Sequence, residues 1–181
     1  MLEVGVTNTQ SAEPPLSFTE ARTHFGAWAI TSAPLIIGMN VTDDETVANF
    51  WDILSNAEAI AVNQDYAGES GNLFWESDDL TFFSPCGWWL ANCTYASAMY
   101  WSKRLSNGDV AVLLMNNADA PAALTLEFDR VPGLLSPQGT QVAVRDVWGR
   151  RDLGRMAGAF VPASPTPSRD SLFLRITPLA S

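Results

Sequence analysis

Residues able to do acid–base chemistry gather at Asn63-Gln64-Asp65, directly after the apolar run 59–62. A buried strand that ends abruptly in a polar cluster is how a parallel β/α barrel delivers side chains to its catalytic face. The pattern therefore predicts a barrel strand at 59–62. We expect Asp65 itself to be structural, because no partner acid lies nearby, and the polar cluster to hydrogen-bond the barrel rim and the domain junction.

Three other titratable residues have local explanations. Asp43 and Asp44 lie in the first turn of a predicted helix, where acidic residues cap free amides and favour the helix dipole. His24 is the only histidine, and one histidine makes neither a metal site nor a catalytic triad. We therefore expect His24 to be a structural or surface residue and no metal ion to be bound.

Aromatic residues form the next group, with Trp88 and Trp89 adjacent and Tyr95, Tyr100 and Trp101 following. They could form a sugar-stacking platform, since aromatic faces pack against the CH faces of pyranoses. We favour the alternative, in which these rings belong to a sandwich core and a domain interface. The sequence shows no glycine-rich phosphate loop or nucleophile elbow, so nucleotide and serine-hydrolase chemistry have no support.

Composition narrows the class of protein. The 181 residues are 47% hydrophobic and carry a net charge of −10, which suits a globular protein with a sizeable core. The acidity argues against binding nucleic acid or anionic membranes through a basic surface. We expect no membrane span and see no targeting segment at the N-terminus, which lacks a basic start and a long apolar stretch.

Two features suggest an exported protein. Cys86 and Cys93 lie seven positions apart, and we favour a local disulfide over two buried free thiols. Asn40-Val41-Thr42 and Asn92-Cys93-Thr94 are glycosylation sequons.

The first part of the chain predicts alternating helices and strands. Capping boxes at Ser17–Glu20 and Thr42–Glu45 begin two helices, and Asn56 is a plausible C-cap of the second. The run 35–37 after Pro34 predicts a short buried strand. With 59–62, the segment looks like the end of a parallel β/α barrel.

The pattern changes near residues 70–78, where helical periodicity stops. Short β-rich runs follow, separated by turn residues such as Asn107-Gly108, a strong hairpin signal. The runs lie at 80–83, 99–105, 110–115, 123–128, 141–146 and 172–176. They predict an antiparallel sandwich.

Several motifs resemble those of the α-galactosidases (melibiases) of glycoside hydrolase family 27. ARTHFGAWAITSAPLIIGMNV, the helix DDETVANFWDILSN and AEAIAVNQDYAG occur in the family's order and spacing. WSKRLSNGDVAVLLMNN and VAVRDVWGRRDLG resemble a hairpin and a turn of the same family. The resemblance covers nearly the whole chain.

The resemblance implies the last β/α units of a (β/α)₈ TIM barrel at 1–72, followed by a C-terminal antiparallel β-sandwich at 73–181. It implies a retaining glycosidase that removes terminal α-linked galactose without a cofactor. In that family both catalytic aspartates precede the stretch that corresponds to Met1, so we expect no catalytic residue in this chain and no activity from it alone. Met1 coincides with a methionine that borders the family's galactose pocket.

The resemblance further implies α-galactoside oligosaccharides or glycoconjugates as ligands of the complete enzyme, and secretion or a lysosomal or vacuolar location. A homodimer and the related α-N-acetylgalactosaminidase activity stay open. A second hypothesis is a non-catalytic carbohydrate-binding or interaction module that uses Trp88, Trp89 and Trp101.

Overall fold

The computed structural model describes residues 1–7, 15–83, 92–134 and 141–179. Within these ranges three α-helices come first: α1 (Phe18–Ile30), α2 (Asp44–Leu54) and α3 (Ala57–Gln64). The strands follow: β1 (Asn72–Glu76), β2 (Leu80–Phe83), β3 (Cys93–Ala96), β4 (Ala98–Arg104), β5 (Val110–Asn116), β6 (Leu126–Glu127), β7 (Val142–Asp146), β8 (Arg151–Met156), β9 (Ala159–Phe160) and β10 (Ser171–Pro178). A short 3₁₀ turn, η1 (Phe128–Arg130), directly follows β6.

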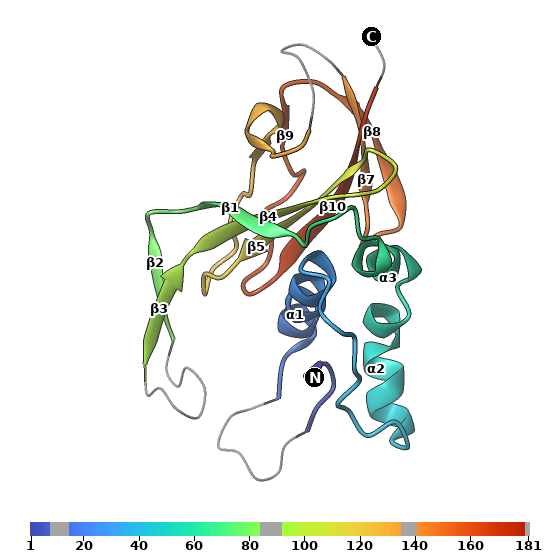
Figure 1. Cartoon of the computed structure of the whole chain (residues 1–181). Coiled ribbons are helices and arrows are strands. Elements are labelled where there is room, and N and C mark those ends of the chain that lie inside the picture. The colour runs from blue at the N-terminus through green and yellow to red at the C-terminus, as the bar shows by residue number, and fades with distance from the viewer. Residues whose placement is uncertain (8–14, 84–91, 135–140, 180–181) are drawn as a thin grey trace.

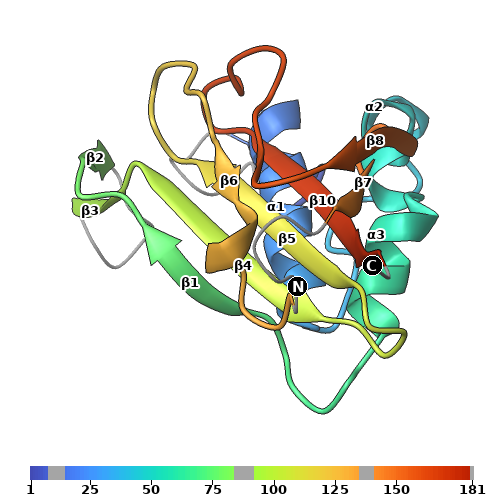
Figure 2. The same cartoon turned by 90° about the horizontal axis from the view of Figure 1, so that it is seen from above.

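The central element is a six-stranded antiparallel sheet with the order β1-β4-β5-β10-β7-β8 (Figure 1). The helices lie on one side of it, and β6 and β9 form a small second sheet on the other (Figure 2). β2 and β3 pair as a separate hairpin. The antiparallel sandwich expected for the second part of the chain is therefore confirmed.

Both faces of the six-stranded sheet are apolar. In β5, Val112 and Leu114 face the core shared with β6 and β9, whereas Ala111 and Leu113 face the core shared with the helices. This is why the run 110–115 is almost continuously hydrophobic: side chains alternate between two buried faces. α1 covers the centre of the helix side, and its buried Phe25 belongs to that core.

The start of α1 is as the sequence predicts. The Glu20 amide donates to Ser17 Oγ at 3.3 Å, and the Ser17 amide donates to Glu20 Oε2 at 2.9 Å, which completes a capping box. For α2 the predicted cap is one residue off. Asp43 is the N-cap, and its carboxylate accepts from the Thr46 hydroxyl at 2.7 Å.

The strand predicted at 59–62 is wrong, because these residues lie in the helix α3. Asn56, expected to end α2, is instead the N-cap of α3 and accepts from the amides of Glu58 and Ala59. This cap and the high helix propensity of Ala57-Glu58-Ala59 outweigh the apolar run. Ala59, Val62 and Asn63 are the buried residues of α3, a helical i, i+3, i+4 spacing.

The buried strand predicted at 35–37 is also wrong. Ile37 makes one isolated parallel bridge to Leu2, and the side chains of Ile36 and Ile37 are 57% and 48% exposed. Barrel strands are not shown in the described ranges, so the barrel half of the fold class stays a prediction.

The helical part approaches the sheet closely where glycine leaves room. The Gly71 amide donates to the Ile30 carbonyl at 2.9 Å, and a Cβ on Gly71 would lie 2.3 Å from that oxygen. Gly26 in α1 lies beside Leu113 and Trp148, with 2.8 Å between a built Cβ and Leu113 Cδ1. Nothing larger than glycine fits at Gly71 without moving backbone.

We expect Gly71→Ala to lower the free energy of unfolding by about 2 kcal/mol or more, because the new methyl group collides with a backbone oxygen rather than a flexible side chain. Gly68→Ala is the matched control. Gly68 has φ +101° and open space around it, so its cost is limited to backbone strain of about 1–2 kcal/mol. Urea unfolding of both variants measures the difference. Equal losses of free energy of unfolding in the two variants would show that the close approach at Gly71 adds no cost beyond backbone strain.

Candidate functional site

The polar cluster singled out in the sequence joins the helices to the sheet. Asp65 ends α3, and its carboxylate accepts from the Ser106 amide and hydroxyl, both at 2.9 Å. Asn63 Nδ2 donates to the carbonyls of Trp28 and Ala33 at 3.1 and 2.9 Å. Ser106 lies in the turn between β4 and β5, so the expected hydrogen bonds at the junction are confirmed, whereas the expected contact with a barrel rim stays a prediction.

Lys103 is a second junction residue, which the sequence analysis missed. Its side chain is 2% exposed, and Nζ donates to the carbonyls of Val62 and Asn63 at the end of α3. Carbonyls without helical partners make a helix C-terminus a favourable place for a cation. Burial lowers the pKa of Lys103, and the nearby Asp65 opposes that shift. The sequence does contain a signal for this residue: in β4, Lys103 comes two residues after Trp101 and therefore lies on the same face of the strand.

Two partly buried ion pairs add to the junction. Arg145 in β7 donates to both carboxylate oxygens of Glu58 in α3, at 2.6 and 2.7 Å, and these bonds raise the arginine pKa. Arg22 in α1 donates through Nε to Asp170 Oδ1 at 2.9 Å, and Asp170 is almost wholly buried. Paired guanidinium–carboxylate contacts fix orientation as well as distance, so α1 and α3 are held in one position against the sheet.

His24 is structural, as expected. Its Nε2 accepts a hydrogen bond from the Glu3 amide at 3.1 Å, and its ring lies 5.7 Å from the ring of Trp28. Burial lowers the pKa of His24, because the charged imidazolium would lose solvation there. An imidazole that accepts from a backbone amide must be neutral at Nε2, so protonation also removes this bond.

For the other predicted site residues, the structure shows the position but not the role. Met1 is exposed, and Cys86 lies outside the described residues, so the pocket role and the disulfide with Cys93 stay predictions. Asn40 and Asn92 are both exposed. Asn40 Oδ1 accepts from the Thr42 amide at 3.1 Å and from its hydroxyl at 2.8 Å.

The predicted aromatic platform divides between two faces. Trp88 and Trp89 lie outside the described residues. Tyr100 belongs to the sandwich core and Trp101 packs against the helix-side core. Tyr95 is exposed on β3, with its ring 5.3 Å from that of Phe83. Since Tyr100 and Trp101 are core and interface residues, the interpretation favoured for them is confirmed.

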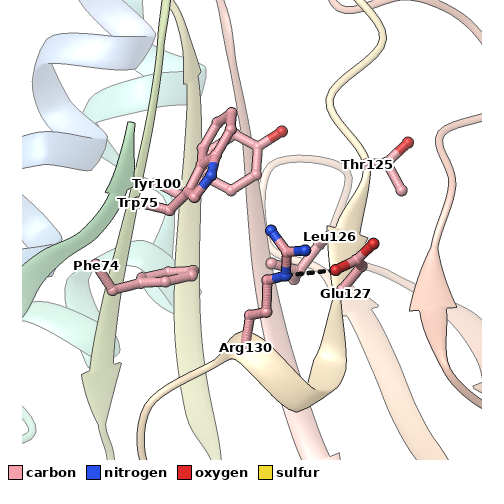
Figure 3. A pocket seen from close by; sticks show the side chains of 7 residues that line it. All are labelled: Phe74, Trp75, Tyr100, Thr125, Leu126, Glu127 and Arg130. Carbon is pink, nitrogen blue, oxygen red and sulfur yellow. Dashed lines mark ion pairs between the residues drawn. The ribbon is translucent and has the colours of Figure 1, made fainter. Parts of the chain in front are cut away.

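A pocket of about 200 Å³ opens on the sandwich side of β1 and β4. The rings of Phe74, Trp75 and Tyr100 form one wall, and the segment around β6 and η1 forms the other (Figure 3). The Trp75 and Tyr100 ring centres are 4.4 Å apart. The lining residues are Phe74, Trp75, Tyr100, Thr125, Leu126, Glu127 and Arg130.

Polar groups border this aromatic wall. Arg130 Nε and Glu127 Oε2 form an ion pair at 2.5 Å, and both side chains are at least half exposed. Tyr100 is 7% exposed, yet its hydroxyl makes no hydrogen bond to any residue in the described ranges. Burial raises the Tyr100 pKa to about 12, so the hydroxyl stays protonated near neutral pH. The pocket therefore offers a donor, an acceptor and flat apolar rings.

Two kinds of site are absent from the part of the chain that the structure describes. No group of three or more His, Cys, Asp or Glu side chains there could hold a metal ion. No helix there is long and apolar enough to cross a bilayer.

Comparison with known proteins identifies the fold. Residues 96–176 match the family described as alpha galactosidase C-terminal beta sandwich domain. The α-galactosidase of Coffea arabica is 32% identical over 178 residues, and that of Cyamopsis tetragonoloba is 34% identical over 150. The matches cover 98% and 82% of this chain but 39% and 29% of those proteins. The crystal structure of α-galactosidase I from Mortierella vinacea superposes with a TM-score of 0.72 at 24% identity, covering 95% of this chain and 39% of that one.

These matches define the chain first as a protein with the C-terminal sandwich of a glycosidase. The curated relatives extend the match through the helical part, so the chain belongs to the α-galactosidase family, glycoside hydrolase family 27, and corresponds to its C-terminal portion. The chain spans less than two fifths of the length of these relatives.

The lowered pKa of His24 predicts a pH dependence of stability. In the unfolded chain the pKa of His24 is near its ordinary value of 6.5, whereas in the folded chain this pKa is lower. Between these two values the unfolded state holds more protons, so stability falls as pH decreases, by at most about 1.4 kcal/mol per pH unit. His24→Gln keeps an acceptor for the Glu3 amide and does not titrate. Urea unfolding near pH 7 and near pH 5 is expected to show the wild type losing more stability than the variant; parallel losses would refute this.

Proposed function

We propose that this chain forms the C-terminal part of a retaining glycoside hydrolase that releases terminal α-galactosyl residues from oligosaccharides or glycoconjugates. The observation that carries the proposal is the similarity to α-galactosidases through both the helical part and the sandwich, including 178 aligned residues of the Coffea arabica enzyme. The curated relatives from Coffea arabica and Cyamopsis tetragonoloba are described as α-galactosidases, which favours galactose over N-acetylgalactosamine as the sugar released.

Retaining hydrolysis needs two carboxyl groups about 5 Å apart, one as nucleophile and one as acid and base. We propose that neither belongs to this chain. The acids nearest the helix–sheet junction are already engaged: Asp65 with Ser106, Glu58 with Arg145 and Asp170 with Arg22. Residues 1–72 would instead complete the catalytic barrel, with Met1 bordering the galactose pocket, and residues 73–181 would form the sandwich domain.

The surface beside the N-terminus supports this division. The Leu2 amide donates to the Ile36 carbonyl at 2.8 Å, and the adjoining Leu2–Ile37 bridge is the one parallel pairing among the described residues. Ile36 and Ile37 are both strongly exposed there. Exposed apolar side chains beside a backbone segment with a single isolated parallel bridge are a liability in an isolated protein. Further parallel strands of a barrel would cover them.

The alternative of a non-catalytic module that binds through Trp88, Trp89 and Trp101 is weakened by the position of Trp101. Its ring is half-buried against the helix-side core and its indole nitrogen is fully buried. A ring in this position cannot present its face to a ligand.

The isolated chain is expected to hydrolyse neither an aryl α-galactoside nor an aryl α-N-acetylgalactosaminide, because the proposal places both carboxyl groups outside it. The assay uses purified chain with a verified far-UV spectrum. Robust turnover of either substrate would contradict the proposal that both catalytic carboxyl groups lie outside this chain.

The reading frame upstream of the Met1 codon tests the same proposal independently. In the family that this chain resembles, the motif Trp-Asn-Asp-Pro-Asp directly precedes the stretch that corresponds to Met1. We therefore expect the reading frame to continue through this motif and two earlier barrel aspartates. An in-frame stop codon directly before Met1 would contradict the proposal.

Export through a secretory pathway predicts glycan attachment at Asn40 and Asn92. When the protein is secreted from a eukaryotic host, deglycosylation is expected to reduce its mass by two glycans, and Asn40→Gln by itself should remove one. Asn56→Gln is not a suitable control, since Asn56 caps α3. Asn49→Gln, at an exposed position of α2 outside any sequon, is expected to leave the mass shift unchanged. An unmodified secreted protein would disprove both sites.

A further inference from the structure

We propose that the pocket lined by Phe74, Trp75, Tyr100, Glu127 and Arg130 binds one neutral hexopyranose unit of a carbohydrate, without chemistry. This inference does not rest on the proposed hydrolase, because the pocket lies within the described part of this chain and can be tested there.

The aromatic wall depends on a departure from regular strand geometry. Successive residues of a strand normally point to opposite faces. Here the pairing of β1 with β4 shifts register between Leu73 and Trp75, which is the signature of a β-bulge at Phe74. As a result Phe74 and Trp75, which are consecutive, both line the pocket. Bulges that re-aim a side chain are frequent next to binding sites.

The polar groups match the hydroxyls of a sugar. Tyr100 is more than nine-tenths buried, its hydroxyl has no hydrogen-bond partner among the described residues, and it points toward the space between the two walls (Figure 3). Tyr100 Oη is not among the enclosed polar atoms that lack a partner, so it is open to solvent at the pocket and a ligand can reach it. The raised pKa keeps the hydroxyl as a donor.

The opposite wall supplies both hydrogen-bond polarities. Glu127 offers acceptors and Arg130 offers donors, and their ion pair holds them side by side at the pocket (Figure 3). Adjacent hydroxyls of a pyranose can donate to a carboxylate and accept from a guanidinium at the same time. Because the pair is neutral overall, it favours an uncharged sugar over an anionic one.

Size limits the ligand to one ring. The volume of about 200 Å³ is below the range of roughly 300–1,000 Å³ found for drug-sized ligands. A pyranose has one apolar CH face and a rim of hydroxyls, which corresponds to aromatic rings on one wall and polar groups on the other. An apolar protein side chain would leave the Tyr100 hydroxyl and the ion pair unused.

The test uses the purified chain and D-galactose, with D-glucose and D-mannose as further neutral hexoses. Saturation-transfer NMR should show contact with at least one of the sugars at millimolar concentration, and the indole N–H signal of Trp75 should shift on titration. Trp75→Phe identifies that signal. Absence of saturation transfer to all three sugars would overturn the proposal.

Variants locate the binding. Glu127→Gln and Arg130→Gln change exposed side chains, so we expect them to fold, and each should weaken binding about tenfold by removing a charge-assisted hydrogen bond. Tyr100→Phe should also weaken it, since it deletes the unpartnered hydroxyl. Arg155→Gln is the matched control, because β8 lies at the opposite edge of the sheet from β1. Binding that survives all three pocket variants, or that Arg155→Gln weakens equally, would place the sugar elsewhere and overturn the proposal.

Discussion

The structure depends on a sheet that must be covered on both faces. In β5 and β10 successive side chains enter two different cores, so neither face of the six-stranded sheet tolerates water. The helices cover one face, and the segment around β6, η1 and β9 covers the other (Figure 2). The helices and the sheet therefore share one hydrophobic core. Removing the helices would expose Ala111, Leu113 and Phe173 together, and the sheet would lose half of its core.

Apolar contact alone does not set the position of the helices; buried polar contacts do. Lys103 reaches the end of α3, Asn56 Nδ2 donates to the Val147 carbonyl at 3.0 Å, and Asp170 receives Arg22. Each contact satisfies a group whose isolation in the core would cost several kcal/mol, roughly 3–5 for one half of a buried ion pair. A displaced helix would break several of these contacts at once. Because all of these contacts must form together, one arrangement of the helices on the sheet is much lower in free energy than slightly displaced arrangements.

The sequence predicts the sandwich better than the helical part, for a physical reason. Period-two and continuous apolar runs bounded by Asn107-Gly108 and similar turns identify β4, β5, β7 and β10 well. The run 59–62 is too short for periodicity to separate strand from helix, and the deciding information is the cap at Asn56, whose side chain serves α3 rather than α2. The pocket could not be predicted from the sequence, for a different reason. It depends on a bulge at Phe74 and on β6 lying opposite β1, and neither leaves a signal in local sequence.

β4 connects the junction and the pocket through strand geometry. Tyr100 points to the sandwich side and enters the pocket, while Trp101 and Lys103 point to the helix side and enter the junction. The same strand pairs with β1, which is an edge strand and needs protection from pairing with other chains. The bulge at Phe74 interrupts the regular ladder of that edge and turns an extra aromatic ring into the pocket. One local irregularity therefore both protects the edge and builds the wall, which explains why a binding surface lies at the margin of the sheet rather than over its closely packed centre.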